Sequence, residues 1–179
     1  GSSYKRIRSK SLNKLSKRIS NLSESATLAM SRLSRELKKE GKDVISLSLG
    51  EPDFNTPEFI KESAIEAINN NFSHYTPVPG IQDLRKSICK KFYRDNKLKF
   101  DENQIVVSTG AKQSIANVCL SLLDKGDEVI LLAPYWVSYY EIVKLCGANP
   151  IVVKSKIENN FKSSVDDIER KISERTKLL

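Results

Sequence analysis

The stretch VVSTGAKQSIANVCLSLL, residues 106–123, opens as a β-branched run, turns at Gly110 and continues with helical spacing of its apolar residues. This order predicts a strand that leads through a tight turn into a helix. Small and hydroxylated residues such as Ser108 and Thr109 at that junction have two explanations. The N–H groups and partial positive charge of a helix start suit a bound anion, whereas a strand-to-helix turn needs a glycine and a capping hydroxyl in any case. The stretch alone leaves both explanations open.

The alternation of strand and helix signals extends along the rest of the chain. Short apolar runs predict strands at residues 44–49, 104–110, 129–132 and 149–155. Helical spacing of apolar residues predicts helices within residues 25–41, 56–71, 81–92, 111–123, 137–147 and 164–173. Strands that alternate with helices form βαβ units, so we expect an α/β fold with a parallel-rich sheet covered by helices on both faces.

Some helix ends and buried faces follow from the same pattern. Thr56 is expected to cap the second predicted helix, with Pro57 at its first helical position. The residues expected to face inward on that helix are Ile60, Ala64, Ala67 and Ile68. On the helix within 111–123 they are Ile115, Val118, Cys119 and Leu122.

Charge is distributed unevenly along the 179 residues, whose formal net charge is +8. Residues 1–42 hold twelve Lys and Arg against three Asp and Glu, and the remainder holds 18 against 19. A basic arm can bind nucleic acid or an acidic surface, but this one has a single aromatic residue and no recognised nucleic-acid motif. We therefore expect no nucleic-acid partner. The acid-poor start is also typical of an organelle-targeting peptide, and its first residues, GSS, are equally typical of a tag remnant; we expect a cytoplasmic protein.

Several classes of protein and site are disfavoured by what the sequence lacks. No apolar run approaches the roughly 18 to 20 residues that span a bilayer, so we expect no membrane association. Cys89, Cys119 and Cys146 are far apart and lack CxxC spacing, so they are predicted as small buried hydrophobic residues in a reducing compartment rather than as metal ligands. No GxxxxGK[ST] or helix-opening GxGxxG motif occurs. His74 lies in a proline-rich loop without metal-ligand spacing, and we expect no metal site.

Ligands of open α/β sheets bind beyond the carboxyl ends of the strands. The predicted loops at such positions are GEPDF, STGAKQS and APYWVSYY. Lys112 lies in the first turn of its helix, where the helix dipole disfavours a cation; either a bound anion offsets that cost or the lysine is simply solvated. Trp136, the only tryptophan, has tyrosines on both sides. Stacking on a planar ligand and ordinary packing of helix on sheet both remain open for it.

Four segments in this order and spacing resemble the first half of class I pyridoxal-phosphate aminotransferases. They are SLGEPDFNTP at 48–57, HYTPVPGIQDLRKSI at 74–88, VVSTGAKQSI at 106–115 and GDEVILLAPYWVSY at 126–139. The similarity is strongest to bacterial-type aspartate aminotransferases and their aspartate/prephenate relatives, and it runs from about Leu15 to Leu179. It implies pyridoxal 5'-phosphate as cofactor and amino and 2-oxo acids as substrates, with aspartate as donor, or prephenate, aromatic or alanine-type substrates as the alternative.

The resemblance assigns cofactor roles to matching residues. Gly110, Ala111 and Lys112 match the turn whose backbone amides hold the cofactor phosphate. Trp136 matches the aromatic residue that stacks on the pyridine ring and touches the substrate. Tyr75 matches the tyrosine that reaches the phosphate of a neighbouring subunit, which implies a homodimer.

The resemblance assigns substrate roles as well. Gly50 matches the glycine whose backbone faces the substrate α-carboxylate. Thr27 and Lys112 match residues that help to bind the distal carboxylate of aspartate or glutamate. Lys112 therefore has a reason to lie where the dipole disfavours a cation.

In the family, the Schiff-base lysine and the carboxylate-binding arginine come after the segment that matches the end of this chain. Transamination needs that amine, and Lys112 is no replacement, so we expect no catalytic residue here, no activity of the chain alone and an exposed sheet edge. The resemblance divides the chain into a basic arm and helix of the small domain, residues 1–45, and the incomplete N-terminal part of the large cofactor-binding domain, residues 46–179. A non-catalytic truncated protein and an unrelated phosphate-binding α/β module are the alternatives.

Overall fold

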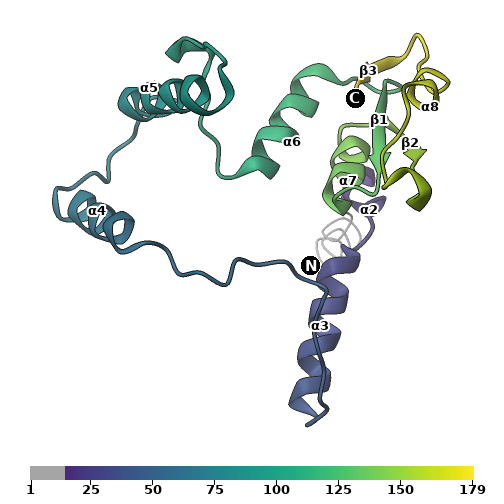
Figure 1. The fold of residues 1–179 in the computed structure, drawn as a ribbon, viewed down its shortest axis with the longest axis horizontal. Helices are drawn as coiled ribbons and strands as arrows, with labels where there is room; N and C mark the ends of the chain where they lie inside the picture. The colour runs from purple at the N-terminus through teal and green to yellow at the C-terminus, as the bar shows by residue number, and fades with distance from the viewer. Residues whose placement is uncertain (1–14) are drawn as a thin grey trace, which may run out of the picture. The chain divides into compact units, whose positions relative to one another are not determined.

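The computed structural model describes residues 15–179 (Figure 1). By its contacts the chain divides into two units. One unit joins the N-terminal segment up to Leu49 with Ile115–Leu179, and the other is Gly50–Ser114. Most of the basic charge predicted for the arm falls on residues before and within the first described helix, and residues 1–14 lie outside the described part.

The first unit contains a three-stranded parallel sheet with strand order β2-β1-β3. Its strands are β1 (Glu128–Ala133), β2 (Asn149–Lys154) and β3 (Thr176–Leu178). In the central part of the register Ile130 lies opposite Ile151. The strands predicted at 129–132 and 149–155 are therefore confirmed, and so is the α/β class with parallel strands.

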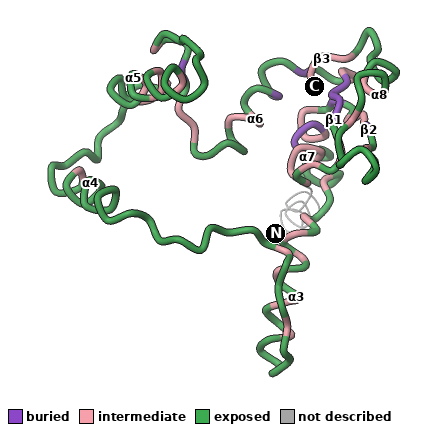
Figure 2. The backbone as a smooth tube through the Cα atoms, viewed as in Figure 1, coloured by how far each residue is buried: buried purple, intermediate pink, exposed green. Residues whose placement is uncertain are grey.

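The core of this unit lies between the sheet and two helices, α6 (Ala111–Leu122) and α7 (Val137–Leu145). Buried residues gather on β1 and α7 (Figure 2). The buried cluster consists of Cys119, Leu123, Val129, Leu131, Ile142, Val143 and Ala148. Ile130 and Val143 are the largest fully buried side chains. Val143 belongs to the cluster, whereas Ile130 lies outside it, because successive side chains of β1 point to opposite faces of the sheet.

The inward face predicted for α6 is partly wrong. Val118 is 49% exposed and Leu122 is 55% exposed, whereas Cys119 and Leu123 are buried. Ile115, Cys119 and Leu123 follow one another at four-residue spacing and make a narrow stripe against the sheet. Residues three positions away from that stripe lie to its side and stay open to solvent.

The remaining helices of this unit are short or peripheral. They are α2 (Lys17–Ser20), α3 (Ala26–Lys39), the 3-10 turn η3 (Ile157–Asn159) and α8 (Val165–Glu169). The capped helix predicted near the end of the chain is confirmed, because the Ser164 side chain accepts the Asp167 backbone N–H at 3.1 Å. Gly41 follows α3 with a φ of +80°, a left-handed conformation that suits glycine at a helix stop.

The second unit is helical and carries irregular connections. It contains α4 (Glu58–Asn69), α5 (Gln82–Lys91), the π-helical turn η1 (Phe92–Asn96) and the 3-10 turn η2 (Glu102–Gln104). Helix α4 begins one residue later than predicted: Pro57, not Thr56, is the N-cap. The ring of proline has no N–H to donate, so it fits either position at a helix start.

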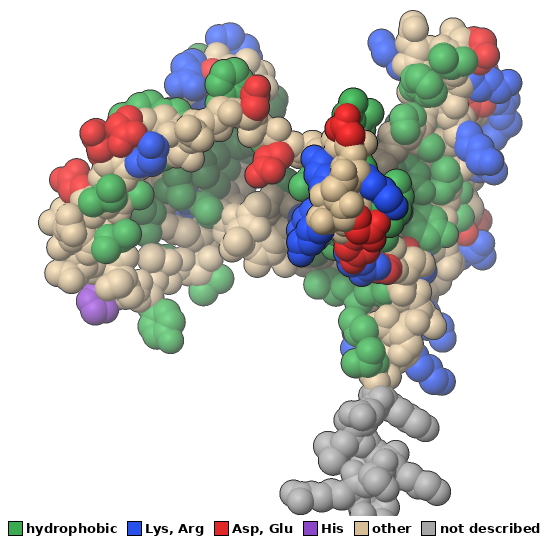
Figure 3. All heavy atoms as spheres, turned by 90° about the horizontal axis from the view of Figure 1, so that it is seen from below, with side chains coloured by type: hydrophobic (Ala, Val, Ile, Leu, Met, Phe, Trp, Pro, Cys, Tyr) green, Lys and Arg blue, Asp and Glu red, His purple; other side chains and the backbone are tan. Residues whose placement is uncertain are grey.

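The buried face predicted for α4 is wrong in the described structure. No residue of α4 is buried, and Ile60 and Ile68 are 46% and 74% exposed. An amphipathic pattern predicts which face of a helix can be buried, but that face is buried only where another element packs against it. Large apolar side chains consequently lie open on the face of the protein drawn in Figure 3.

Two predicted strands, 44–49 and 104–110, do not form in the described residues. Ile45 and Leu47 are 84% and 91% exposed. Within 104–110, the Val107 N–H donates to the Pro79 oxygen at 2.9 Å instead of entering a ladder. β-Branched runs favour an extended backbone, but a strand exists only where a neighbouring strand takes up its N–H and C=O groups.

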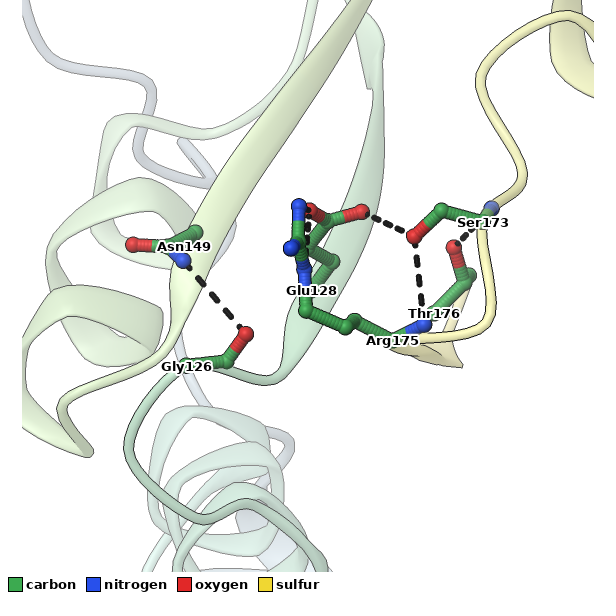
Figure 4. A network of polar contacts seen from close by, with 6 residues as sticks. All are labelled: Gly126, Glu128, Asn149, Ser173, Arg175 and Thr176. Atoms are coloured by element: carbon green, nitrogen blue, oxygen red, sulfur yellow. Dashed lines mark hydrogen bonds and ion pairs between the residues drawn. The ribbon is translucent and has the colours of Figure 1, made fainter.

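A buried carboxylate fastens the short strand β3 to the start of β1 (Figure 4). Glu128 accepts hydrogen bonds from the Ser173 hydroxyl at 2.6 Å and from Arg175 Nε and Nη2 at 2.9 and 2.6 Å. The Glu128 backbone N–H donates to the Arg175 oxygen at 2.8 Å. The Ser173 hydroxyl and then the Arg175 guanidinium hold the pKa of the Glu128 carboxyl below its ordinary value.

We expect Glu128→Gln to flatten the dependence of thermal stability on pH on the acid side. Because the folded-state pKa of Glu128 is depressed, its carboxylate stabilises the fold above the unfolded value of about 4.3, and this contribution is lost as pH falls through the folded-state pKa. The glutamine variant should start with a lower Tm at neutral pH and lose less on acidification. Thermal unfolding at several pH values between about 3 and 7 measures this.

Glu158→Gln is the matched control, because Glu158 is an exposed residue of η3 far along the chain from β1. The control should keep the acid-side slope of the parent protein. Equal slopes for the Glu128 variant and the parent would contradict the role given to this carboxylate.

Candidate active site

The turn before α6 has a backbone conformation that favours glycine. Gly110 has a φ of +84°, which a residue with a side chain rarely adopts. Its N–H donates to the Ser108 oxygen at 2.8 Å, and the Gln113 side chain accepts the Thr109 N–H. The first bond of the helix runs from the Ser114 N–H to the Gly110 oxygen at 3.4 Å. Helix α6 therefore begins at a tight turn, which the Gln113 side chain closes by accepting the Thr109 N–H.

The donors of this turn suit a phosphate monoester. The first N–H groups of a helix lack acceptors within the helix and sit at the positive end of its dipole. A Cβ placed on Gly110 would meet nothing within 4 Å, so no neighbouring side chain covers the backbone there. Residues 105–114 contain no Asp or Glu, and the exposed Lys112 adds a cation to the hydroxyls of the turn. A phosphate group thus fits the chemistry of these residues.

The loop that carries Tyr75 is attached to the same turn. The Pro79 oxygen accepts the Val107 N–H at 2.9 Å, one residue before Ser108. Gly80, with a φ of +102°, packs so closely on Val107 that a Cβ at Gly80 would lie 2.7 Å from Val107 Cγ2. Tyr75 itself is fully exposed. Two segments that the sequence separates by about 30 residues are therefore brought together within the second unit.

The first unit contains a cavity with a volume of about 390 Å³, and its lining includes Ala26, Tyr135 and Val137. These are sequence neighbours of Thr27 and Trp136, which are not themselves among the lining residues. Thr27 is half-buried in the first turn of α3, and Trp136, the N-cap of α7, is 45% exposed. The Ser23 N–H donates to Glu141 Oε2 at 3.2 Å and ties the segment before α3 to α7.

The aromatic residues around Trp136 divide into two groups. Tyr135, Tyr139 and Tyr140 pack against the buried cluster, and burial raises the pKa of Tyr135. Trp136 does not belong to that cluster. Packing on the buried cluster therefore accounts for the three tyrosines, whereas Trp136 keeps 45% of its surface exposed.

The structure thus groups the predicted residues within each unit. Thr27 and Trp136 belong to the first unit, and Gly50, Tyr75 and the Gly110–Lys112 turn belong to the second. Gly50 is exposed in the loop that follows residues 44–49. Among residues 15–179 no group of His, Cys, Asp or Glu is arranged to hold a metal ion, and no helix there is long and apolar enough to cross a membrane.

Sequence reasoning missed one residue of this arrangement, Arg85 of α5. Its guanidinium donates from Nε to the Gly80 oxygen at 3.1 Å and from Nη1 to the Glu102 oxygen at 2.9 Å. A signal was available, because Ile81, Leu84, Arg85 and Ile88 follow the spacing of one apolar helix face. A cation on such a face needs buried acceptors.

Comparison with known proteins assigns the chain to a family. Residues 42–179 match the sequence model of "Aminotransferase class I and II". The chain is 48% identical over 165 residues to a probable aspartate/prephenate aminotransferase of Rickettsia conorii, which covers 92% of this chain and 41% of that protein. It is 45% identical over 166 residues to an aspartate aminotransferase of Bacillus subtilis, covering 93% of this chain and 42% of that protein.

A solved structure agrees with these sequence relatives. The aspartate aminotransferase of Thermus thermophilus with maleate superposes with a TM-score of 0.89 at 39% identity, covering 93% of this chain and 44% of that one. The chain thus spans well under half the length of the relatives that it matches. On the family match and these identities, the chain belongs to the class I and II aminotransferases.

Proposed function

We propose that the full-length protein carrying this chain is a pyridoxal-phosphate-dependent aspartate aminotransferase. It would transfer the amino group of L-aspartate to 2-oxoglutarate and yield oxaloacetate and L-glutamate. The observation that carries the proposal is the Ser108–Lys112 turn at the start of α6, with its left-handed Gly110 and its acid-free surroundings, in a chain of the aminotransferase family. Such a turn offers backbone donors and positive potential to a phosphate.

We assign two roles in cofactor binding. The amides of Gly110, Ala111 and Lys112 bind the phosphate, the Gly110 N–H exchanging its bond to the Ser108 oxygen for one to the ligand. The partly exposed indole of Trp136 stacks on the planar ring. Bound pyridoxal phosphate supplies a conjugated ring that accepts the electrons left at the substrate α-carbon when its proton leaves. No lysine of this chain is given the role of the catalytic amine.

We assign substrate binding to three residues. The backbone at Gly50 faces the α-carboxylate. The hydroxyl of Thr27 and the ammonium of Lys112 bind the distal carboxylate of aspartate, for which a hydroxyl and a cation are suitable donors. A substrate with two carboxylates is thereby held at both ends, which orients its α-carbon.

We also propose a cytoplasmic homodimer in which Tyr75 reaches the phosphate of the neighbouring subunit. The support is the exposure of apolar side chains beside it: Val78 is 96% exposed and Phe72 is 78% exposed. Adjacent exposed apolar side chains on a folded protein mark surfaces that another chain covers. The division into a small-domain part, residues 1–45, and a large-domain part, residues 46–179, belongs to the same proposal.

The test is the formation of oxaloacetate by the purified full-length protein. With pyridoxal phosphate, aspartate and 2-oxoglutarate present, oxaloacetate and glutamate should appear in equal amounts. Protein that binds pyridoxal phosphate but forms no oxaloacetate would contradict aspartate as the donor.

A second candidate keeps the reaction and changes the amino acceptor or donor. The relative of Rickettsia conorii is named for both aspartate and prephenate, so prephenate is the first alternative to test, followed by aromatic and alanine-type substrates. The ratios of kcat/KM over these substrates separate the candidates. A higher kcat/KM for any of them than for the aspartate pair would replace aspartate as the proposed substrate.

We expect Lys112→Ala to lower kcat/KM for aspartate by about tenfold and to change kcat/KM for alanine by less than about twofold. Alanine has no distal carboxylate, so it loses no partner when the ammonium is removed. Lys125→Ala, which removes another exposed lysine just beyond the opposite end of α6, is the control and should change neither value. Equal losses for aspartate and alanine would instead assign Lys112 to the cofactor alone.

A further inference from the structure

Arg85 makes an unusual pair of contacts for an arginine of a helix. Its part-buried guanidinium donates to two backbone oxygens, those of Gly80 at 3.1 Å and Glu102 at 2.9 Å. The ion pairs of the described residues do not include Arg85. The planar fork of an arginine can hold two acceptors in fixed directions. The geometry of the group, rather than a charge partner, is therefore what the fold uses.

The two oxygens frame the segment that leads into the phosphate turn. Gly80 ends the loop that carries Tyr75, and its Cα packs on Val107. The Glu102 oxygen also accepts the Ile105 N–H at 3.2 Å, and Ile105 is buried. Arg85 thus holds the chain at the beginning of residues 102–107 and holds the loop that packs against their end.

A second bond completes the connection. The Val107 N–H donates to the Pro79 oxygen at 2.9 Å, so the Tyr75 loop and the residue before Ser108 are joined directly. Gln82 adds a side-chain bond to Glu102 Oε1 at 2.7 Å from the first turn of α5. The start of α5, the Tyr75 loop and the segment before the turn therefore form one bonded assembly with Arg85 at its centre.

We infer that Arg85 is a positioning residue for phosphate binding, which couples the Tyr75 loop to the Ser108–Lys112 turn. The inference rests on the proposed function, in which the turn binds the phosphate of its own subunit and Tyr75 binds that of the neighbour. One guanidinium then sets the positions of both phosphate-binding elements. Errors of about 1 Å in such elements can cost on the order of 100-fold.

The effect of Arg85 should be specific to the phosphate. Pyridoxal has the same ring and aldehyde as pyridoxal phosphate but no phosphate group. A displaced turn therefore weakens binding of pyridoxal phosphate and leaves binding of pyridoxal nearly unchanged. General loss of structure weakens both.

The experiment measures the affinities of the cofactor-free full-length protein for pyridoxal phosphate and for pyridoxal by equilibrium dialysis. We expect Arg85→Ala and Arg85→Lys to lower the ratio of the two affinities by about tenfold to 100-fold. Lysine keeps the positive charge but cannot donate to two oxygens in the fixed directions of a guanidinium, so Arg85→Lys should not restore the affinity ratio of the parent protein. Arg94→Gln is the matched control, because Arg94 belongs to the same unit, is highly exposed and pairs only with Asp95 in the described structure.

Each result either supports or overturns the role inferred for Arg85. A lowered ratio in both Arg85 variants, with the parent ratio in Arg94→Gln, supports the inference. A parent ratio in Arg85→Lys overturns it, even if the Tm falls, and this variant serves when Arg85→Ala does not fold. If the parent protein has no preference for pyridoxal phosphate over pyridoxal, the proposed function fails, and the inference falls with it.

Discussion

Replacing Ile130 by alanine is expected to lower the free energy of unfolding by about 2 to 5 kcal/mol. Ile130 is 2% exposed, lies in the middle of the central strand β1 and faces Ile151 of β2 in the register. Truncation removes apolar contacts and leaves a cavity between packed elements that cannot collapse fully. Urea unfolding followed by circular dichroism gives the free energy from the transition midpoint and slope.

Ile130→Val is the graded control for this prediction. It removes a single methylene at the same position and should cost about 0.5 to 1.5 kcal/mol. A similar small loss for both variants would mean that Ile130 is not enclosed as the structure describes.

Gly110→Ala is expected to weaken binding of pyridoxal phosphate by about tenfold or more. The left-handed φ of +84° costs an alanine about 1 to 2 kcal/mol, so the turn relaxes toward a negative φ. That relaxation redirects the backbone amides that the proposed function assigns to the phosphate. Equilibrium dialysis of the cofactor-free full-length protein measures the affinity.

Gly126→Ala is a closely matched control. Gly126 has a φ of +97°, and a Cβ there, as at Gly110, would meet nothing within 4 Å. Both substitutions therefore introduce the same kind of backbone strain without a steric clash, but Gly126 lies in the turn before β1. Equal affinities for the cofactor in the two variants would contradict the assignment of the Gly110 turn to the phosphate.

Local patterns were reliable where an element carries its own signal. Helix α7 ends near Gly147, and α8 begins after the Ser164 cap, as their residues predict. Strand β1 was recognisable because its apolar run follows a turn at Gly126. The Gly110 turn was likewise predictable, since only glycine tolerates its backbone conformation readily.

Contacts between distant residues could not be predicted in the same way. The pairing of Glu128 with Arg175 joins residues 47 apart. The local sequence around either residue does not indicate which residue it will pair with. The fork of Arg85 joins a loop and a 3-10 turn that no sequence pattern relates. Burial of α4 and pairing of residues 44–49 failed as predictions because both need a partner surface.

The sequence by itself determined which runs are helical and which are extended, the positions of the tight turns and the motifs of the aminotransferase family. Those features depend on backbone conformation and on residue types within a few positions of one another. Only the tertiary structure decided which extended runs became strands, which helix faces were covered and how the Tyr75 loop is tied to the Gly110 turn. Apolar faces are buried and backbone hydrogen bonds are made between segments. The sequence of one segment therefore specifies its apolar face and its donors and acceptors, but not which other segment will pack against them or bond to them.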